Sequence, residues 1–136
     1  MNRKEIIRYA ADELIGKGNI AIISKFFTPD YAAHAGDKEY RGHEFIKQFI
    51  KQVHDSIPDI HVVSVEFLAE DRNKIVWQRT LKGTHKHNLQ GIPASGKKVK
   101  WVDMVVSRFR NEMIAEEWVV SELMGELLVK VPSKRI

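Results

Sequence analysis

The sequence predicts an α+β fold in which a curved, mainly antiparallel sheet wraps around N-terminal helices. Apolar residues recur at helical spacing as far as about residue 56, and from residue 60 they alternate with polar residues at a period of two. Very short polar connections join two pairs of the later segments, which indicates antiparallel hairpins. Helices followed by a run of long strands favour helices packed on one face of the sheet.

Three helices are expected in the first half of the chain, over residues 6–15, 20–27 and 41–56. Gly16 and Gly18 end the first helix, and Asn19 can cap the second. The third helix carries its apolar residues on one stripe, which consists of Phe45, Ile46, Phe49, Ile50 and Val53. Between the second and third helices, residues 31–35 form a short extended segment that ends in a turn at Gly36.

Four strands rich in Val, Ile, Trp and Phe are expected in the second half, over residues 60–69, 74–85, 98–109 and 113–121. A short helix over 122–129 and a basic tail from about residue 130 complete the chain. Neither a linker nor a repeat interrupts this order, so residues 1–136 are expected to form a single domain.

The composition excludes several classes of function. The net charge of +4 is modest, and no basic stripe interleaved with aromatic residues indicates nucleic-acid binding. No run approaches the length of a membrane span, and no apolar signal segment follows Met1, so we expect a cytoplasmic protein without a membrane partner. The chain has no cysteine, and its six histidines lack the spacing of zinc motifs, so no metal site is expected.

The last strand brings carboxylates and apolar side chains to one face. Regular alternation points five residues the same way, namely Ile114, Glu116, Trp118, Val120 and Glu122. If this face lines a cavity, a carboxylate there is partly desolvated. Its pKa then rises toward that of a useful general base.

The expected strand pairing gathers further residues at one end of the sheet. If Phe109 lies opposite Ile114, the ladder places Trp101 near Glu122. The other hairpins bring two histidines to the same end, so one pocket rim is expected to hold His61, His85, Trp101 and Glu122. Each residue also has an ordinary structural interpretation: Glu122 as the acidic residue at a helix N-terminus, the histidines as surface or core residues, and the tryptophans as packing residues.

Seven short segments of the chain resemble one known family. In order, they are Tyr31-x-x-His34, Arg41-Gly42-His43-Glu44, Pro58-Asp59, Gly83-Thr84-His85, Gly91-Ile92-Pro93-x-x-Gly96-Lys97, Arg108-Phe109 and Ile114-x-Glu116-x-Trp118. Together they resemble the SnoaL-like polyketide cyclases, also called ester cyclases, from about Ile6 to Leu127. The resemblance implies the nuclear-transport-factor-two-like fold, a cone-shaped barrel with a hydrophobic pocket, and a homodimer.

The resemblance also implies an activity and its residues. Characterised cyclases of this family close a ring by an intramolecular aldol reaction without a cofactor, and their acid/base is an aspartate four residues after the tryptophan. That position is Glu122 here, and the family's histidines fall on His34 and His85. An arginine of the family falls on Gln78, which implies a loss of positive charge in the pocket.

Three functions therefore remain open on a common fold. The first is cofactor-free proton abstraction beside a carbonyl of a small hydrophobic compound. Glu122 would be the base and His34 or His85 the oxyanion donor, while Gln78, Trp101, Trp118 and His61 shape the pocket. The second is a non-catalytic module that binds a small hydrophobic ligand. The third is hydrolysis or isomerisation, for which Tyr9 and Tyr31 are the candidate orienting groups.

Overall fold

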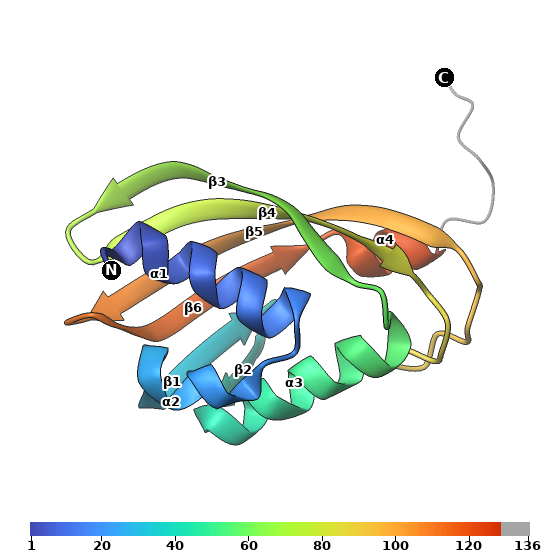
Figure 1. Cartoon of the computed structure of the whole chain (residues 1–136), viewed down its shortest axis with the longest axis horizontal. Helices are drawn as coiled ribbons and strands as arrows, with labels where there is room; N and C mark the ends of the chain where they lie inside the picture. Colours follow the sequence, from blue (N-terminus) through green and yellow to red (C-terminus); the bar gives the residue numbers. More distant parts are fainter. Residues whose placement is uncertain (129–136) are drawn as a thin grey trace.

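A computed structural model describes residues 1–128 and contains a six-stranded, curved and unclosed sheet, shown in Figure 1. The strand order is β2-β1-β6-β5-β4-β3. Neighbouring strands run antiparallel except β1 and β6, which are parallel. The predicted α+β class is confirmed. The basic tail expected from about residue 130 lies outside the described residues.

The helices follow the expected positions closely. They are α1 (Arg3–Ala10), the π-helical continuation η1 (Ala11–Gly16), the 3-10 turn η2 (Ile20–Ile22), α2 (Ile23–Phe26), α3 (Gly42–Ser56) and α4 (Leu123–Leu128). A capping box starts α1, because Asn2 accepts the backbone N–H of Glu5 while Glu5 accepts that of Asn2. The apolar faces of α1 and α3 lie on the same side of the sheet (Figure 1).

The four long strands are β3 (His61–Asp71), β4 (Lys74–Thr84), β5 (Lys98–Arg110) and β6 (Met113–Ser121). Two tight turns close their hairpins, with Arg72 at a φ of 42° and Asn111 at a φ of 57°. Positive φ values match the twist of the flanking strands in short hairpins, and asparagine tolerates them better than most residues. The predicted hairpins β3–β4 and β5–β6 are therefore confirmed.

The first strands of the sheet differ from the expectation. The extended segment expected over residues 31–35 is the second half of a longer strand, β1 (Phe27–Ala35). Strand β2 (Lys38–Arg41) was not expected, because its side chains are all exposed and show no alternation. The parallel pairing of β1 with β6 sets Ala33 opposite Glu117 and His34 opposite Trp118.

A close approach in the core fixes one end of β4. The position that a Cβ on Gly83 would occupy lies 2.2 Å from Cγ2 of Ile57, a fully buried residue at the end of α3. Glycine is therefore required where β4 passes the segment between α3 and β3. At the same place Asp59 accepts hydrogen bonds from the backbone and the side chain of Thr84.

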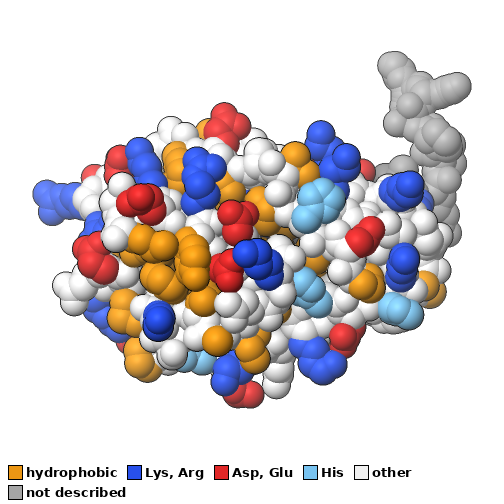
Figure 2. Space-filling model, in the orientation of Figure 1, with side chains coloured by type: hydrophobic (Ala, Val, Ile, Leu, Met, Phe, Trp, Pro, Cys, Tyr) orange, Lys and Arg blue, Asp and Glu red, His pale blue; other side chains and the backbone are white. Residues whose placement is uncertain are grey.

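The surface gives no sign of a basic stripe on the face seen in Figure 2. There, lysine, arginine and acidic side chains are intermixed, and hydrophobic atoms lie between them. No helix within residues 1–128 is both long and apolar enough to cross a membrane.

Candidate functional site

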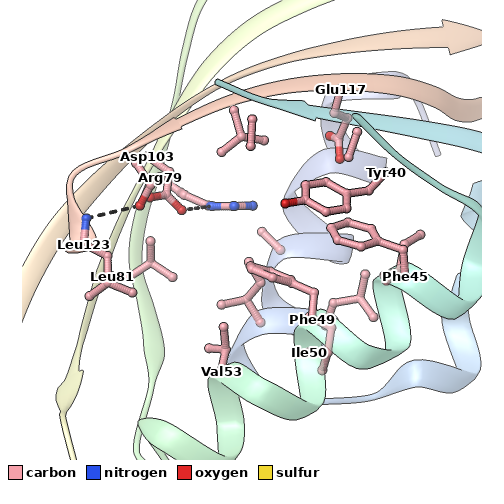
Figure 3. A pocket seen from close by; sticks show the side chains of 18 of the residues that line it. Tyr40, Phe45, Phe49, Ile50, Val53, Arg79, Leu81, Asp103, Glu117 and Leu123 are labelled. Atoms are coloured by element: carbon pink, nitrogen blue, oxygen red, sulfur yellow. Dashed lines mark hydrogen bonds and ion pairs between the residues drawn. The ribbon is translucent and has the colours of Figure 1, made fainter. Parts of the chain in front are cut away.

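A cavity of about 540 Å³ lies between the helices and the concave face of the sheet. One wall is α3, which contributes Phe45, Phe49, Ile50 and Val53 (Figure 3). The opposite wall comes from inward-facing residues of the strands, including Trp77, Leu81 and Trp101. A largely apolar cavity of this volume with a few polar groups is typical of sites for small organic ligands.

Two neighbouring strands contribute an ion pair to this wall. Arg79 of β4 lies directly opposite Asp103 of β5, and the Nε of Arg79 donates to Oδ2 of Asp103 at 2.8 Å. Their side chains are 11% and 8% exposed, respectively. The guanidinium group also stacks over the ring of Trp77, 5.5 Å from the centroid. Figure 3 shows this group reaching from Asp103 into the cavity toward the hydroxyl of Tyr40.

Glu117 of β6 is the second acidic group of the cavity wall. Its Oε1 accepts a hydrogen bond from the hydroxyl of Tyr31 at 2.8 Å, and its Oε2 accepts one from Ser107. Ser107 in turn accepts from Nε1 of Trp77 at 2.9 Å. Tyr31 of β1 and Ser107 of β5 therefore hold the Glu117 carboxyl group in one orientation, and Trp77 of β4 supports Ser107.

The electrostatic environment of Glu117 suits proton transfer. Burial raises the pKa of Glu117, although hydrogen bonds from Ser107 and Tyr31 and the positive charge of Arg79 act in the opposite direction. Burial also raises the pKa of Tyr31 well above its ordinary value, with the charge of Glu117 adding to the effect. Tyr31 therefore remains a hydrogen-bond donor at neutral pH. A carboxyl group with a raised pKa in a cavity is a candidate general base.

A β-bulge in β6 explains why Glu117 faces inward instead of Glu116. Phe109 pairs with Ile114 as expected, but Arg108 pairs with Glu116, so Ala115 is an additional residue in the strand. One additional residue moves every later side chain to the opposite face. Ile114 and Glu117 consequently both line the cavity.

The expected position of Glu122 in the pocket is therefore wrong. After the bulge, Ser121 pairs with Asp103, and Glu122 lies beside Val102 instead of Trp101. The side chain of Glu122 is exposed, does not line the cavity and accepts the backbone N–H of Val102 at 3.1 Å. Glu122 immediately precedes α4. This position agrees with its ordinary structural interpretation as the acidic residue at a helix N-terminus.

His34 and Trp118 meet on the outward face of the sheet. Their rings stack at 5.2 Å with an interplanar angle of 14°. His34 borders the cavity, but its Nε2 is 2.6 Å from Oε2 of Glu116, and neither Glu116 nor Trp118 lines the cavity. Burial by itself raises the pKa of Glu116, but hydrogen bonds from His34 and Arg108 and their charges outweigh it, so its pKa is lowered.

The other predicted site residues are dispersed. Trp101 is buried and lines the cavity. Gln78 lies between the inward-facing Trp77 and Arg79, so it points outward, and the positive charge expected to be lost is instead supplied by Arg79.

Two of the predicted histidines also lie away from the cavity. His61 is exposed, and its Nδ1 is 3.2 Å from the backbone oxygen of Asp59. His85 is fully buried, and its Nδ1 is 2.9 Å from Oγ of Ser95. Neither histidine lines the cavity.

The residues that were missed carried a recognisable signal. Arg79 alternates with Trp77 and Leu81, and Asp103 alternates with Trp101 and Val105. A charged residue on the apolar face of a strand is costly unless it is paired, so each position was a candidate for a buried pair or site. Glu117 carried no comparable signal, since its inward orientation depends on the bulge.

No group of three or more histidine, aspartate or glutamate residues within the described part of the chain is arranged to hold a metal ion.

Comparisons with known proteins agree on one family. The family model for SnoaL-like polyketide cyclases matches residues 5–128. A comparison with curated proteins finds no match. Among solved structures, a protein from Jannaschia sp. CCS1 assigned as a SnoaL-like polyketide cyclase is 21% identical, with a TM-score of 0.80 over 90% of this chain and 87% of that one.

Two further structures show the same fold. A protein from Acidithiobacillus ferrooxidans assigned as a polyketide cyclase is 24% identical, with a TM-score of 0.77 over 91% of this chain and 90% of that one. AclR from Streptomyces galilaeus, assigned as a hydroxylase, is 21% identical, with a TM-score of 0.76 over 92% of this chain and 94% of that one. Similarity at this level establishes the fold and leaves the reaction open.

Proposed function

The chain belongs to the SnoaL-like polyketide cyclase family, and we propose that it is a cofactor-independent cyclase-type enzyme acting on a small hydrophobic carbonyl compound. The observation that carries this proposal is the Glu117 carboxyl group, whose pKa is raised by burial in the wall of an apolar cavity that also contains Arg79. Glu117 replaces Glu122 as the proposed base.

The proposed reaction begins with removal of a proton from the carbon next to a carbonyl. The Glu117 carboxylate takes the proton, and the C–H electron pair forms an enolate whose oxygen accepts hydrogen bonds from Arg79. The enolate carbon then bonds to a second carbonyl carbon of the same molecule. The oxygen of that carbonyl takes the proton back from Glu117, so the product is an isomer of the substrate and no electrons are gained or lost.

The cavity supports each step of this scheme. Its largely apolar walls favour a hydrophobic substrate. Tyr31 and Ser107 fix the orientation of the base, and a fixed base within reach of its proton is what general base catalysis requires. A cationic donor in a site of low dielectric strongly stabilises a developing oxyanion.

The test is α-proton exchange with the model ketone 1-tetralone in D₂O, followed by NMR. Glu117→Gln should lower the protein-dependent exchange rate by about 10²- to 10⁴-fold, the usual contribution of a general base. Glu116→Gln is the matched control, because Glu116 is the adjacent carboxylate on the outward face, and it should retain exchange near the wild-type rate. Equal exchange by wild type and Glu117→Gln contradicts the proposal.

One observation favours the alternative of a non-catalytic binding protein. Both oxygens of Glu117 already accept hydrogen bonds, as expected of a carboxylate that serves only to hold the strands together. This alternative predicts that 1-tetralone binds to the wild type without any protein-dependent exchange. Binding and exchange measured on the same sample therefore separate the two functions.

A further inference from the structure

The Arg79–Asp103 pair has hydrogen-bonding capacity that the protein itself does not use. Oδ2 of Asp103 accepts from Arg79, but Oδ1 has no hydrogen-bond partner among the described residues, although the Asp103 side chain is only 8% exposed. An unsatisfied buried carboxylate oxygen is costly, and such groups in native proteins call for an explanation. Asp103 lines the cavity, so a ligand there can supply the missing donor.

Arg79 offers unused hydrogen-bond donors next to this unused acceptor. A guanidinium group carries five N–H donors in a planar fork, and Arg79 uses its Nε for Asp103. Its remaining N–H groups have no hydrogen-bond acceptor within residues 1–128, and Figure 3 shows the group extending into the cavity. Because Arg79 and Asp103 are paired across β4 and β5, the free donors and the free acceptor lie side by side.

The charge of the pair restricts what can bind there. An anion would be attracted to Arg79 but repelled by Asp103, and a cation would meet the reverse situation. A neutral ligand that presents only an acceptor would satisfy Arg79 and leave Oδ1 of Asp103 unpaired. The arrangement therefore fits a neutral ligand that presents a hydrogen-bond acceptor and a hydrogen-bond donor side by side.

We propose that Arg79 and Asp103 together recognise a carbonyl oxygen with a hydroxyl group beside it on the substrate. Arg79 donates to the carbonyl oxygen, and the hydroxyl group donates to Oδ1 of Asp103. This inference rests on the proposed function, because it defines the class of carbonyl compound that the same cavity accepts. It makes Asp103 a specificity-determining residue that discriminates hydroxy-ketones from simple ketones.

The test compares the affinity of the wild-type protein for three flavones of the same skeleton. 3-Hydroxyflavone has the carbonyl and the neighbouring hydroxyl, 3-methoxyflavone has the hydroxyl blocked, and flavone has none. A hydrogen bond to a charged group favours 3-hydroxyflavone over the other two by about tenfold or more. The pair 2-quinolinone and N-methyl-2-quinolinone forms a separate arm, which reports whether an N–H beside a carbonyl is accepted as well as an O–H.

Asp103→Asn should abolish this preference, because its amide can present N–H groups to the ligand while its oxygen faces Arg79. We expect the three flavones to bind this variant within about threefold of one another. Gln78→Ala, on the outward face of β4 next to Arg79, is the control that should retain the tenfold preference. Arg79→Lys should weaken all three flavones alike, since each carries the carbonyl, and it serves as the second test if Asp103→Asn does not fold.

Several results would overturn the inference. These are equal affinity of the wild type for all three flavones, a preference that survives in Asp103→Asn, and no detectable binding of 3-hydroxyflavone. The same titration on Glu117→Gln separates this inference from the proposed function. Retained preference together with unchanged proton exchange would reject Glu117 as the base while supporting recognition by Arg79 and Asp103.

Discussion

Two adjacent residues show how the fold gives identical side chains different properties. Glu116 and Glu117 follow each other in β6, yet the pKa of Glu116 is lowered and that of Glu117 is raised. Glu116 points outward, where it is hydrogen-bonded to His34 and forms an ion pair with Arg108. Glu117 points into the cavity, where burial outweighs its neutral donors and the charge of Arg79.

The raised pKa of Glu117 predicts a pH dependence of stability. A carboxyl group with a higher pKa in the folded state than its ordinary value of 4.5 stabilises the fold most below that value. This stabilisation is lost as the pH rises through the folded-state pKa, because ionisation then costs more in the folded protein. The free energy of unfolding of wild type, relative to Glu117→Gln, should therefore fall as the pH increases from about 4.5.

Urea unfolding of both proteins between pH 4 and pH 8 measures this difference. Glu116→Gln serves as the reference, because its pH dependence should run in the opposite direction. The lowered pKa of Glu116 stabilises the fold above pH 4.5, and this contribution is lost on acidification. A difference between wild type and Glu117→Gln that stays constant or grows with pH would show that burial does not dominate at Glu117.

At the scale of the elements, much of the fold could be predicted from the sequence. The long strands and the major helices have strong periodic patterns and clear end signals, and their observed bounds lie close to the predicted ones. Strand β2 could not be predicted, because it is short and entirely exposed. The bulge at Ala115 leaves no mark in the composition, so regular alternation selected Glu116 and Glu122 instead of Glu117.

The close approach of β4 to the end of α3 predicts a sensitive position. Gly83→Ala should destabilise the protein by about 1–3 kcal/mol, because the new Cβ would overlap the Cγ2 of Ile57. Gly125→Ala in α4 is the control: no atom lies within 4 Å of its added Cβ, and alanine favours helices. Thermal unfolding measures both variants, and equal stability of the two would contradict the packing seen at Gly83.

At the scale of the whole molecule, the sheet and the helices together create the polar site. Glu117, Arg79 and Asp103 belong to three adjacent strands, and the apolar wall opposite them comes from α3 (Figure 3). The sequence predicted a pocket lined by one end of the sheet, and of the seven predicted site residues only Trp101 and His34 border the cavity. The expected homodimer and the cytoplasmic location stay predictions.

The central claim is that this fold buries Glu117 in a cavity and so makes it a usable base. The most direct measurement is an NMR titration of the side-chain carboxyl carbons, with Glu117→Gln used to assign the Glu117 signal. We predict that the pKa of Glu117 lies above the ordinary glutamate value and that the pKa of Glu116 lies below it. A Glu117 pKa at or below the ordinary value would contradict the claim.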